Sequence, residues 1–319
     1  MILFFNRAGI VFLIALMGCS IGPLCLAGEA ADHLLDAAKK GDLARAKGLL
    51  AQGVRVDVKD GQGFTPLMWA AVKGHVKVVR ILLDQGADAN AKANDGWTVL
   101  MWTAIRDNDE TIQILLDGGS AVNAQTRDGM TALMIAAGRG HSHAVARLLK
   151  NGADMKKQMT DGNTALMMAA EGARDATAKV LLDKGADPNK KNRNGWTALI
   201  FASMQGHAAT TDALLAKGAD VNVKSPDGMT PLIFAALGGH KALAQSLLDR
   251  GADVNARGDG QSTPLMLAVD GGHLDLTKIL LAKGADVHAK TESGETALTI
   301  ANARGESKMI HLLKNGSAR

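Results

Sequence analysis

The stretch DGMTPLIFAALGGHKALAQSLLDRGADVNAR, residues 227–257, contains the pattern that decides the fold. Thr230 followed by Pro231 marks a helix start, because the threonine hydroxyl caps the first turn and the fixed φ of proline suits the first helical position. An apolar segment over 232–236 follows, and Gly239 ends it. A second helix is expected over 241–249. The stretch therefore predicts two short helices joined by a turn, with a polar hairpin leading to the next copy.

The same pattern fills the chain with a period of 33 residues and no insertion or deletion. The capping threonines are Thr65, Thr98, Thr131, Thr164, Thr197, Thr230, Thr263 and Thr296. A leucine of the second helix keeps the same period at Leu82, Leu115, Leu148, Leu181, Leu214, Leu247, Leu280 and Leu313. A fixed period in this length range is the signature of a solenoid, in which each repeat packs only on its neighbours.

The unit resembles the ankyrin repeat over about residues 32–316. The resemblance is carried by Asp227-Gly228-Met229-Thr230-Pro231-Leu232, Ala235-Ala236, Gly239-His240, Leu247-Leu248 and Gly251-Ala252-Asp253-Val254-Asn255. It implies a right-handed stack of helix pairs with projecting hairpin fingers, and a concave face made by the fingers and the first helices. We expect an all-α ankyrin solenoid over 28–319, with a degenerate cap repeat over 32–60 and eight full repeats starting near residues 61, 94, 127, 160, 193, 226, 259 and 292.

Several copies depart from the family pattern. The family's histidine three residues after the threonine is replaced by a soft apolar side chain in five copies, at Met68, Met101, Met134, Met167 and Met266. Asp107, Ala173 and Gln261 stand where other copies have glycine, which predicts locally less stable or bent repeats. Met155-Lys156-Lys157-Gln158 departs from the usual Val-Asn ending, and Lys314 replaces a leucine, as expected of a terminal cap.

The composition excludes several classes of protein. Apolar residues make up 47% of the chain and charged residues 21%, with a net charge of +4, so a strongly charged disordered chain is excluded. Nucleic acid is not expected as the partner, because binding phosphates needs a concentrated basic face. The two cysteines, Cys19 and Cys25, both precede residue 30, which excludes a disulfide scaffold and a thiolate metal site in the body of the protein.

The N-terminus has the order of an export signal. Arg7 precedes an apolar run over 8–17, Gly22-Pro23 breaks the helix, and a segment ending at Ala27 offers a small residue for cleavage. We expect a signal peptide over 1–27 and a mature chain without cysteine in the bacterial periplasm. No later segment approaches the length of a membrane span.

Two other interpretations of the N-terminus stay open. Leu16-Met17-Gly18-Cys19 resembles a bacterial lipobox, in which Cys19 would be lipidated and anchored to the membrane. Alternatively, the stretch from Ala8 to Ala27, of marginal length for a span, would remain as an uncleaved anchor. A eukaryotic secreted origin is also compatible with the sequence.

No motif for catalysis or for a cofactor is present: the phosphate loop, dinucleotide fingerprint, nucleophile elbow, HExxH and calcium loop are all missing. Histidines recur with the period of the repeat, at His75, His141, His207, His240 and His273. Successive rings would be about 10 Å apart, the usual distance between packed helices, whereas Zn–N bonds are ~2 Å long. We therefore expect packing and capping roles for them, and no enzyme, cofactor or metal.

Aromatic side chains after residue 27 occupy only two positions of the repeat. Phe64, Trp97 and Trp196 lie one residue before the threonine, where Met130 and Met229 stand in two further copies. The second position, four residues after the threonine on the first helix, is filled by Trp69, Trp102, Phe201 and Phe234. Arg106 and Arg139 add positive charge to the first-helix face, and aromatic residues with arginine are typical of binding hot spots.

For the first-helix aromatics, packing between repeats and partner contact are equally open interpretations. For Trp97 and Trp196 we favour partner contact, because a finger has little core to enter. The expected partner-binding residues are Phe64, Trp69, Trp97, Trp102, Arg106, Met130, Arg139, Trp196 and Met229.

We therefore expect a monomeric, non-enzymatic scaffold that binds a protein in the concave face. Alternatives are a lipid-anchored envelope scaffold, and a stress-protective or inhibitor protein that uses the same surface. A basic cluster at Lys190-Lys191-Asn192-Arg193, beside Lys156-Lys157 of the preceding finger, would favour an acidic partner.

Overall fold

The computed structural model describes the backbone of residues 23–316 and the side chains of residues 28–315. Within that range the chain forms eighteen α-helices and one 3-10 turn and has no β-strand, which confirms the all-α class. Helix α2 (Pro23–Lys40) runs through Ala27, so the part of the expected signal that is described is helical. The remainder of that signal, with Cys19, lies outside the described residues. None of the helices described has both the length and the apolar character that crossing a bilayer demands.

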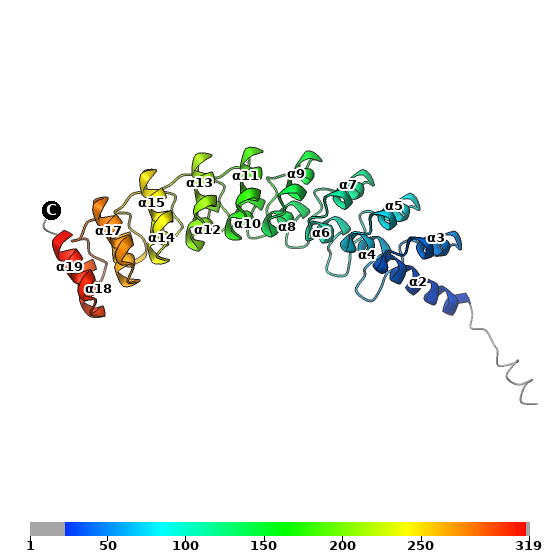
Figure 1. Cartoon of the computed structure of the whole chain (residues 1–319), viewed down its shortest axis with the longest axis horizontal. Helices are drawn as coiled ribbons and strands as arrows, with labels where there is room; N and C mark the ends of the chain where they lie inside the picture. The colour runs from blue at the N-terminus through cyan, green and yellow to red at the C-terminus, as the bar shows by residue number, and fades with distance from the viewer. Residues whose placement is uncertain (1–22, 317–319) are drawn as a thin grey trace, which may run out of the picture. The chain divides into compact units, whose positions relative to one another are not determined.

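The described residues form two compact units, which are joined in sequence between Ala121 and Val122. The helices of unit 1 are α2, α3 (Leu43–Ala51), α4 (Pro66–Lys73), α5 (Val76–Asp84), α6 (Val99–Ala104) and α7 (Asp109–Asp117). Within this unit α2, α4 and α6 pack side by side as the first helices of their repeats, and α3, α5 and α7 form the row of second helices (Figure 1).

Unit 2 repeats the same arrangement. Its first helices are α8 (Ala132–Arg139), α10 (Ala165–Glu171), α12 (Ala198–Gln205), α14 (Pro231–Leu237), α16 (Pro264–Asp270) and α18 (Ala297–Arg304). Its second helices are α9 (Ser142–Lys150), α11 (Asp175–Asp183), α13 (Ala208–Ala216), α15 (Lys241–Asp249), α17 (Leu274–Ala282) and α19 (Ser307–Gly316). The 3-10 turn η1 (Asp259–Gln261) lies in one finger.

Every predicted threonine cap is confirmed. In each repeat the threonine Oγ1 accepts a hydrogen bond from the backbone N–H three residues later, over 3.2–3.4 Å. The bond satisfies one of the N–H groups that a helix start leaves without a partner. The five methionines that follow the caps are all buried, as expected of apolar contacts within the stack.

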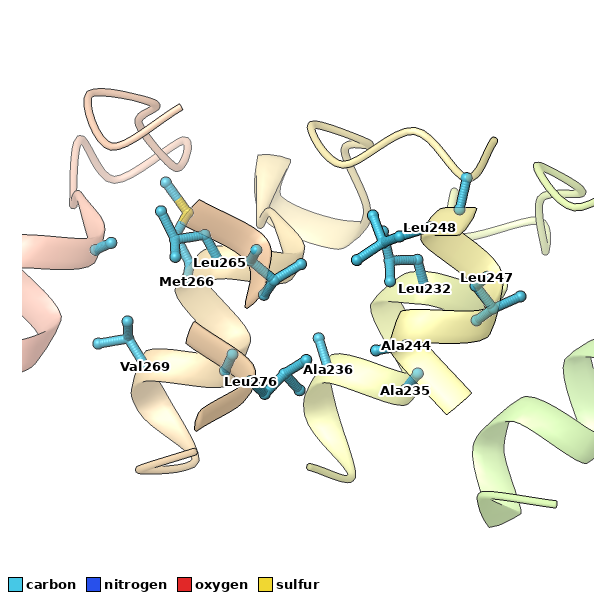
Figure 2. Close-up of a cluster of buried hydrophobic side chains, with 14 of the residues drawn as sticks. Leu232, Ala235, Ala236, Ala244, Leu247, Leu248, Leu265, Met266, Val269 and Leu276 are labelled. Carbon is cyan, nitrogen blue, oxygen red and sulfur yellow. The ribbon is translucent and has the colours of Figure 1, made fainter. Parts of the chain in front are cut away.

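The core of each unit is a continuous layer of small and aliphatic side chains. Figure 2 shows the part of this layer around α14–α17, where Leu232, Leu247, Leu265 and Met266 belong to one buried cluster. Because burying each such side chain is worth about 1.5–3 kcal/mol, the helix pairs are held mainly by the neighbouring repeats.

The fingers differ from the expected extended hairpins. They are tight turns closed by two backbone hydrogen bonds, such as those from the Ala93 N–H to the Trp97 carbonyl over 3.0 Å and from the Gly96 N–H to the Ala93 carbonyl over 2.9 Å. One isolated antiparallel bridge, between Lys92 and Thr98, is the only β-type pairing recorded in the described part of the chain. Each turn closes within a few residues, which leaves too little chain for a ladder.

The three positions where glycine is replaced keep the glycine conformation. The φ angles are +53° at Asp107, +55° at Ala173 and +60° at Gln261. This left-handed region costs a residue with a Cβ roughly 1–2 kcal/mol. The backbone is therefore strained at these three positions.

Candidate partner-binding surfaces

Four aromatic rings of unit 1 are in contact with one another, and we call them the unit-1 aromatic cluster: Phe64, Trp69, Trp97 and Trp102. The ring centroid of Phe64 lies 4.9 Å from that of Trp69 and 5.1 Å from that of Trp102. Trp97 lies 4.9 Å from Trp102, and all three pairs are tilted. Contacts of this kind stabilise beyond the area that they bury. Finger and first-helix aromatics thus form one surface rather than two.

The members of the cluster are not equally accessible. The three indoles are half-buried, whereas Phe64 is only 7% exposed, because its ring lies against both Trp69 and Trp102. The expectation that Phe64 itself faces a partner is therefore corrected: its side chain supports the tryptophans, which carry the accessible area.

Polar neighbours fix one of these indoles. Trp69 Nε1 donates a hydrogen bond of 2.8 Å to Asp60 Oδ2. On its ring face, Lys39 Nζ lies 4.6 Å from the ring centroid, a cation–π contact. Trp102 differs, since its Nε1 is buried and has no hydrogen-bond partner among the described residues. Sequence reasoning missed Asp60 and Lys39, although Asp60 stands in the turn just before Phe64.

Cations border the cluster at the ends of α4 and α6. Lys73 and Arg106 are exposed, and neither forms an ion pair within the described part of the chain. Val72 and Ile105 precede them and are half-buried. Unit 1 thus presents half-buried indoles and aliphatic side chains beside two solvent-exposed positive charges.

Unit 2 holds a smaller ring group. Trp196 lies 5.4 Å from Phe201 and 6.1 Å from Phe234, measured between ring centroids. Phe201 is buried, while Trp196 and Phe234 are half-buried. On the same helix as Phe234, Leu237 is 52% exposed, the most exposed of the large hydrophobic side chains described. Trp196 therefore contacts first-helix aromatic rings in unit 2, just as Trp97 contacts Trp102 in unit 1.

The remaining expected residues lie apart from these ring groups. Met130 and Met229 are half-buried and take part in no ring contact that the structure records. The Sδ of Met229 lies over Gly258, where an added Cβ would come within 2.7 Å of it, so Met229 packs on the next finger. Arg139 is exposed at the end of α8.

The recurring histidines link neighbouring repeats. The Nε2 atoms of His75, His207 and His240 lie 3.2, 3.1 and 3.4 Å from backbone oxygens at the ends of the preceding first helices. In one of the copies without histidine, Arg174 Nε donates over 3.1 Å to the carbonyl of Gly138. No group of side chains able to hold a metal is found among the described residues. These geometries favour a structural role.

Four described carboxyl groups have a lowered pKa: Asp36 pairs with Lys40 and Arg45 near the N-terminal end, and the other three belong to ion pairs of the second helices. A hydrogen bond from Lys217 lowers the pKa of Asp183 below its usual value. Asp249 also has a lowered pKa, because Lys283 and Gln245 both donate to its carboxylate. Both aspartates are solvent-exposed and close their helices, so the shifts reflect surface pairing between repeats and no catalytic constellation.

Stacked helix pairs with aromatic side chains on the fingers and first helices define a repeat solenoid of the binding type. Family models agree: ankyrin repeats in three copies match residues 34–126, 100–192 and 175–258, and a model of many copies matches 247–301. The chain belongs to the ankyrin-repeat family. Such proteins are generally non-enzymatic scaffolds for protein–protein interaction. A search of curated proteins returns no match.

Proposed function

We propose that this protein is an exported scaffold that binds a protein partner through the unit-1 aromatic cluster. The observation that carries the proposal is the continuous contact of four rings, of which three remain half-exposed beside Lys73 and Arg106. Buried aromatic anchors with a bordering cation are the composition that carries most of the binding energy in protein interfaces. Because the rings already hold each other, little side-chain entropy is lost on binding.

The charge at this surface indicates a partner with an acidic rim. Lys73 is the last residue of α4, Arg106 lies in the turn after α6, and neither forms an ion pair with the described residues. Opposite charges on a partner would raise the association rate and fix its orientation. The ring group around Trp196 in unit 2 is proposed as a second contact surface, with Leu237 as its most accessible apolar side chain.

The test is capture of the partner from a periplasmic extract by the immobilised protein. The double variant Lys73→Glu with Arg106→Glu is expected to lose the captured protein, because two favourable charge contacts become repulsive. The matched control reverses two exposed lysines of the second helices, Lys47→Glu with Lys77→Glu, and is expected to capture as well as the wild type. If both variants capture the partner equally, the binding surface is elsewhere.

Export is a separate part of the proposal. It is supported by the charge, apolar run and small-residue order of residues 1–27. The mass of the mature N-terminus distinguishes the alternatives, since cleavage after Ala27 leaves Gly28 first, whereas processing at the lipobox leaves a diacylated Cys19. An uncleaved chain recovered with membranes would contradict both forms of processing.

A further inference from the structure

Asparagine side chains bridge successive repeats in unit 2. Eight residues before four of the capping threonines, the Nδ2 of an asparagine donates to the carbonyl of the glycine that ends the next second helix, while its Oδ1 accepts from the N–H two residues beyond that glycine. The distances of these bonds are 2.8–3.2 Å. The bridging side chains are Asn123, Asn189, Asn222 and Asn255.

Lys156 occupies the bridging position at one junction of the same unit. Its ammonium group has no acceptor, so it is unable to receive a backbone N–H. Within the described residues no hydrogen bond reaches the carbonyl of Gly185 or the N–H of Asp187, the two groups that an asparagine would pair. The junction therefore leaves one backbone donor and one backbone acceptor open, spaced for a single carboxamide.

A pocket of about 420 Å³ lies at this junction. Met155, Leu166 and Leu181 are among its apolar walls, Lys156 and Lys190 contribute to its lining, and Gly185 and Asp187 face it. A volume of this size is in the range that small ligands occupy. The open backbone pair thus belongs to two exposed residues that line a pocket with partly apolar walls.

We propose that this pocket binds a primary carboxamide, such as the side chain of an asparagine or glutamine in a peptide. The amide nitrogen donates to the carbonyl of Gly185, the amide oxygen accepts from the N–H of Asp187, and the aliphatic part lies against Leu166 and Leu181. The ligand then makes in trans the bridge that Asn222 makes within the chain to Gly251 and Asp253. This site is distinct from the aromatic cluster of unit 1 and does not depend on the function proposed for it.

The direct test is a titration of the purified chain with isobutyramide, followed by the amide resonances in ¹H–¹⁵N NMR spectra. The Asp187 resonance is expected to shift and saturate with a Kd on the order of millimolar, as befits a fragment with two hydrogen bonds. Isobutyrate has the same carbon skeleton with a carboxylate, and is expected to leave this resonance in place. A larger shift with isobutyrate would show an anion site made by the lysines and overturn the proposal, as would no shift with either probe.

Two variants distinguish the effect of restoring the asparagine bridge from the effect of removing a positive charge from the pocket. Lys156→Asn supplies the carboxamide within the chain, and is expected to raise the Tm by about 2–4 °C and to weaken isobutyramide binding at least about tenfold. Lys190→Asn removes the same charge from the pocket lining without supplying the bridge, and is expected to change neither quantity appreciably. Unchanged isobutyramide binding in Lys156→Asn, or loss of binding in Lys190→Asn, would contradict the carboxamide site.

Discussion

Two repeats of unit 2 reach the same fold with different local chemistry. The repeat capped by Thr230 follows a bridging Asn222 and ends its first helix at glycines, whereas the repeat capped by Thr164 follows Lys156 and has Ala173 at φ +55°. Both keep the threonine cap and a second helix of nine residues. The buried leucine stripe and the cap thus determine the repeat, while the junction loops tolerate substitutions.

The largest expected effect tests the shared part of the comparison. Leu247→Ala is expected to lower the free energy of unfolding by about 2–5 kcal/mol, because Leu247 is fully buried between helix pairs. Leu181→Ala, at the same position of the irregular repeat, should cost less, since Leu181 adjoins the open pocket and its removal leaves no sealed cavity. Urea unfolding of the two variants measures the difference. An equal loss of unfolding free energy in the two variants would show that the pocket beside Leu181 does not reduce the cost of removing the side chain.

Asn222→Lys copies the irregular junction into the regular repeat. The variant loses two hydrogen bonds, to Gly251 and from Asp253, and is expected to be destabilised by about 1–3 kcal/mol. The readout is the urea midpoint, compared with that of Asn194→Lys, at an exposed finger position where the side chain makes no recorded hydrogen bond. An unchanged midpoint in Asn222→Lys would mean that the asparagine bridges do not stabilise the fold and that Lys156 does not destabilise its junction.

Ala173→Gly makes the irregular repeat resemble the regular one. Glycine adopts the left-handed conformation without strain, but it also increases the conformational entropy of the unfolded chain. The free energy of unfolding is therefore expected to rise by only about 0.5–1 kcal/mol. Thermal unfolding followed by circular dichroism measures it. The matched reverse change, Gly239→Ala, should be destabilising, because a Cβ there would meet the ring of His273 at 2.4 Å. Destabilisation by Ala173→Gly would refute the assigned strain.

The smallest effect concerns an ion pair that both repeats retain. The hydrogen bond from Lys283 holds the pKa of Asp249 below its ordinary 3.8. The pair therefore stabilises fully above the unfolded pKa, and this contribution is lost as the pH falls below about 3.8 through the folded pKa. Asp249→Asn and Asp183→Asn should both flatten the fall of Tm in this window. Equal slopes in wild type and variants would show that the pairs contribute nothing measurable.

Most of the fold was predictable from the sequence because its determinants are local. The threonine caps and the buried methionines follow from spacing within a single repeat, and they were confirmed. The expected hairpins were wrong in detail, since turn residues signal a reversal of the chain but not whether a ladder continues beyond it.

The candidate surfaces were predictable only in part. The positions of Trp97 and Trp102 indicated a common face, but the burial of Phe64 depends on Trp102, which belongs to the next repeat. The bridging role of the asparagines was missed, although their period of 33 residues, broken at Lys156, was visible in the sequence. That break becomes a pocket only when two fingers lie side by side.

The sequence by itself determined the repeat: its length, its caps, its apolar stripe and the glycine positions. These depend on backbone preferences and on which side chains avoid water, and both act over a few residues. Only the tertiary structure decided which rings remain accessible and where backbone groups stay unpaired. Those properties arise from contacts between residues about one period apart, and such contacts exist only once the repeats are stacked.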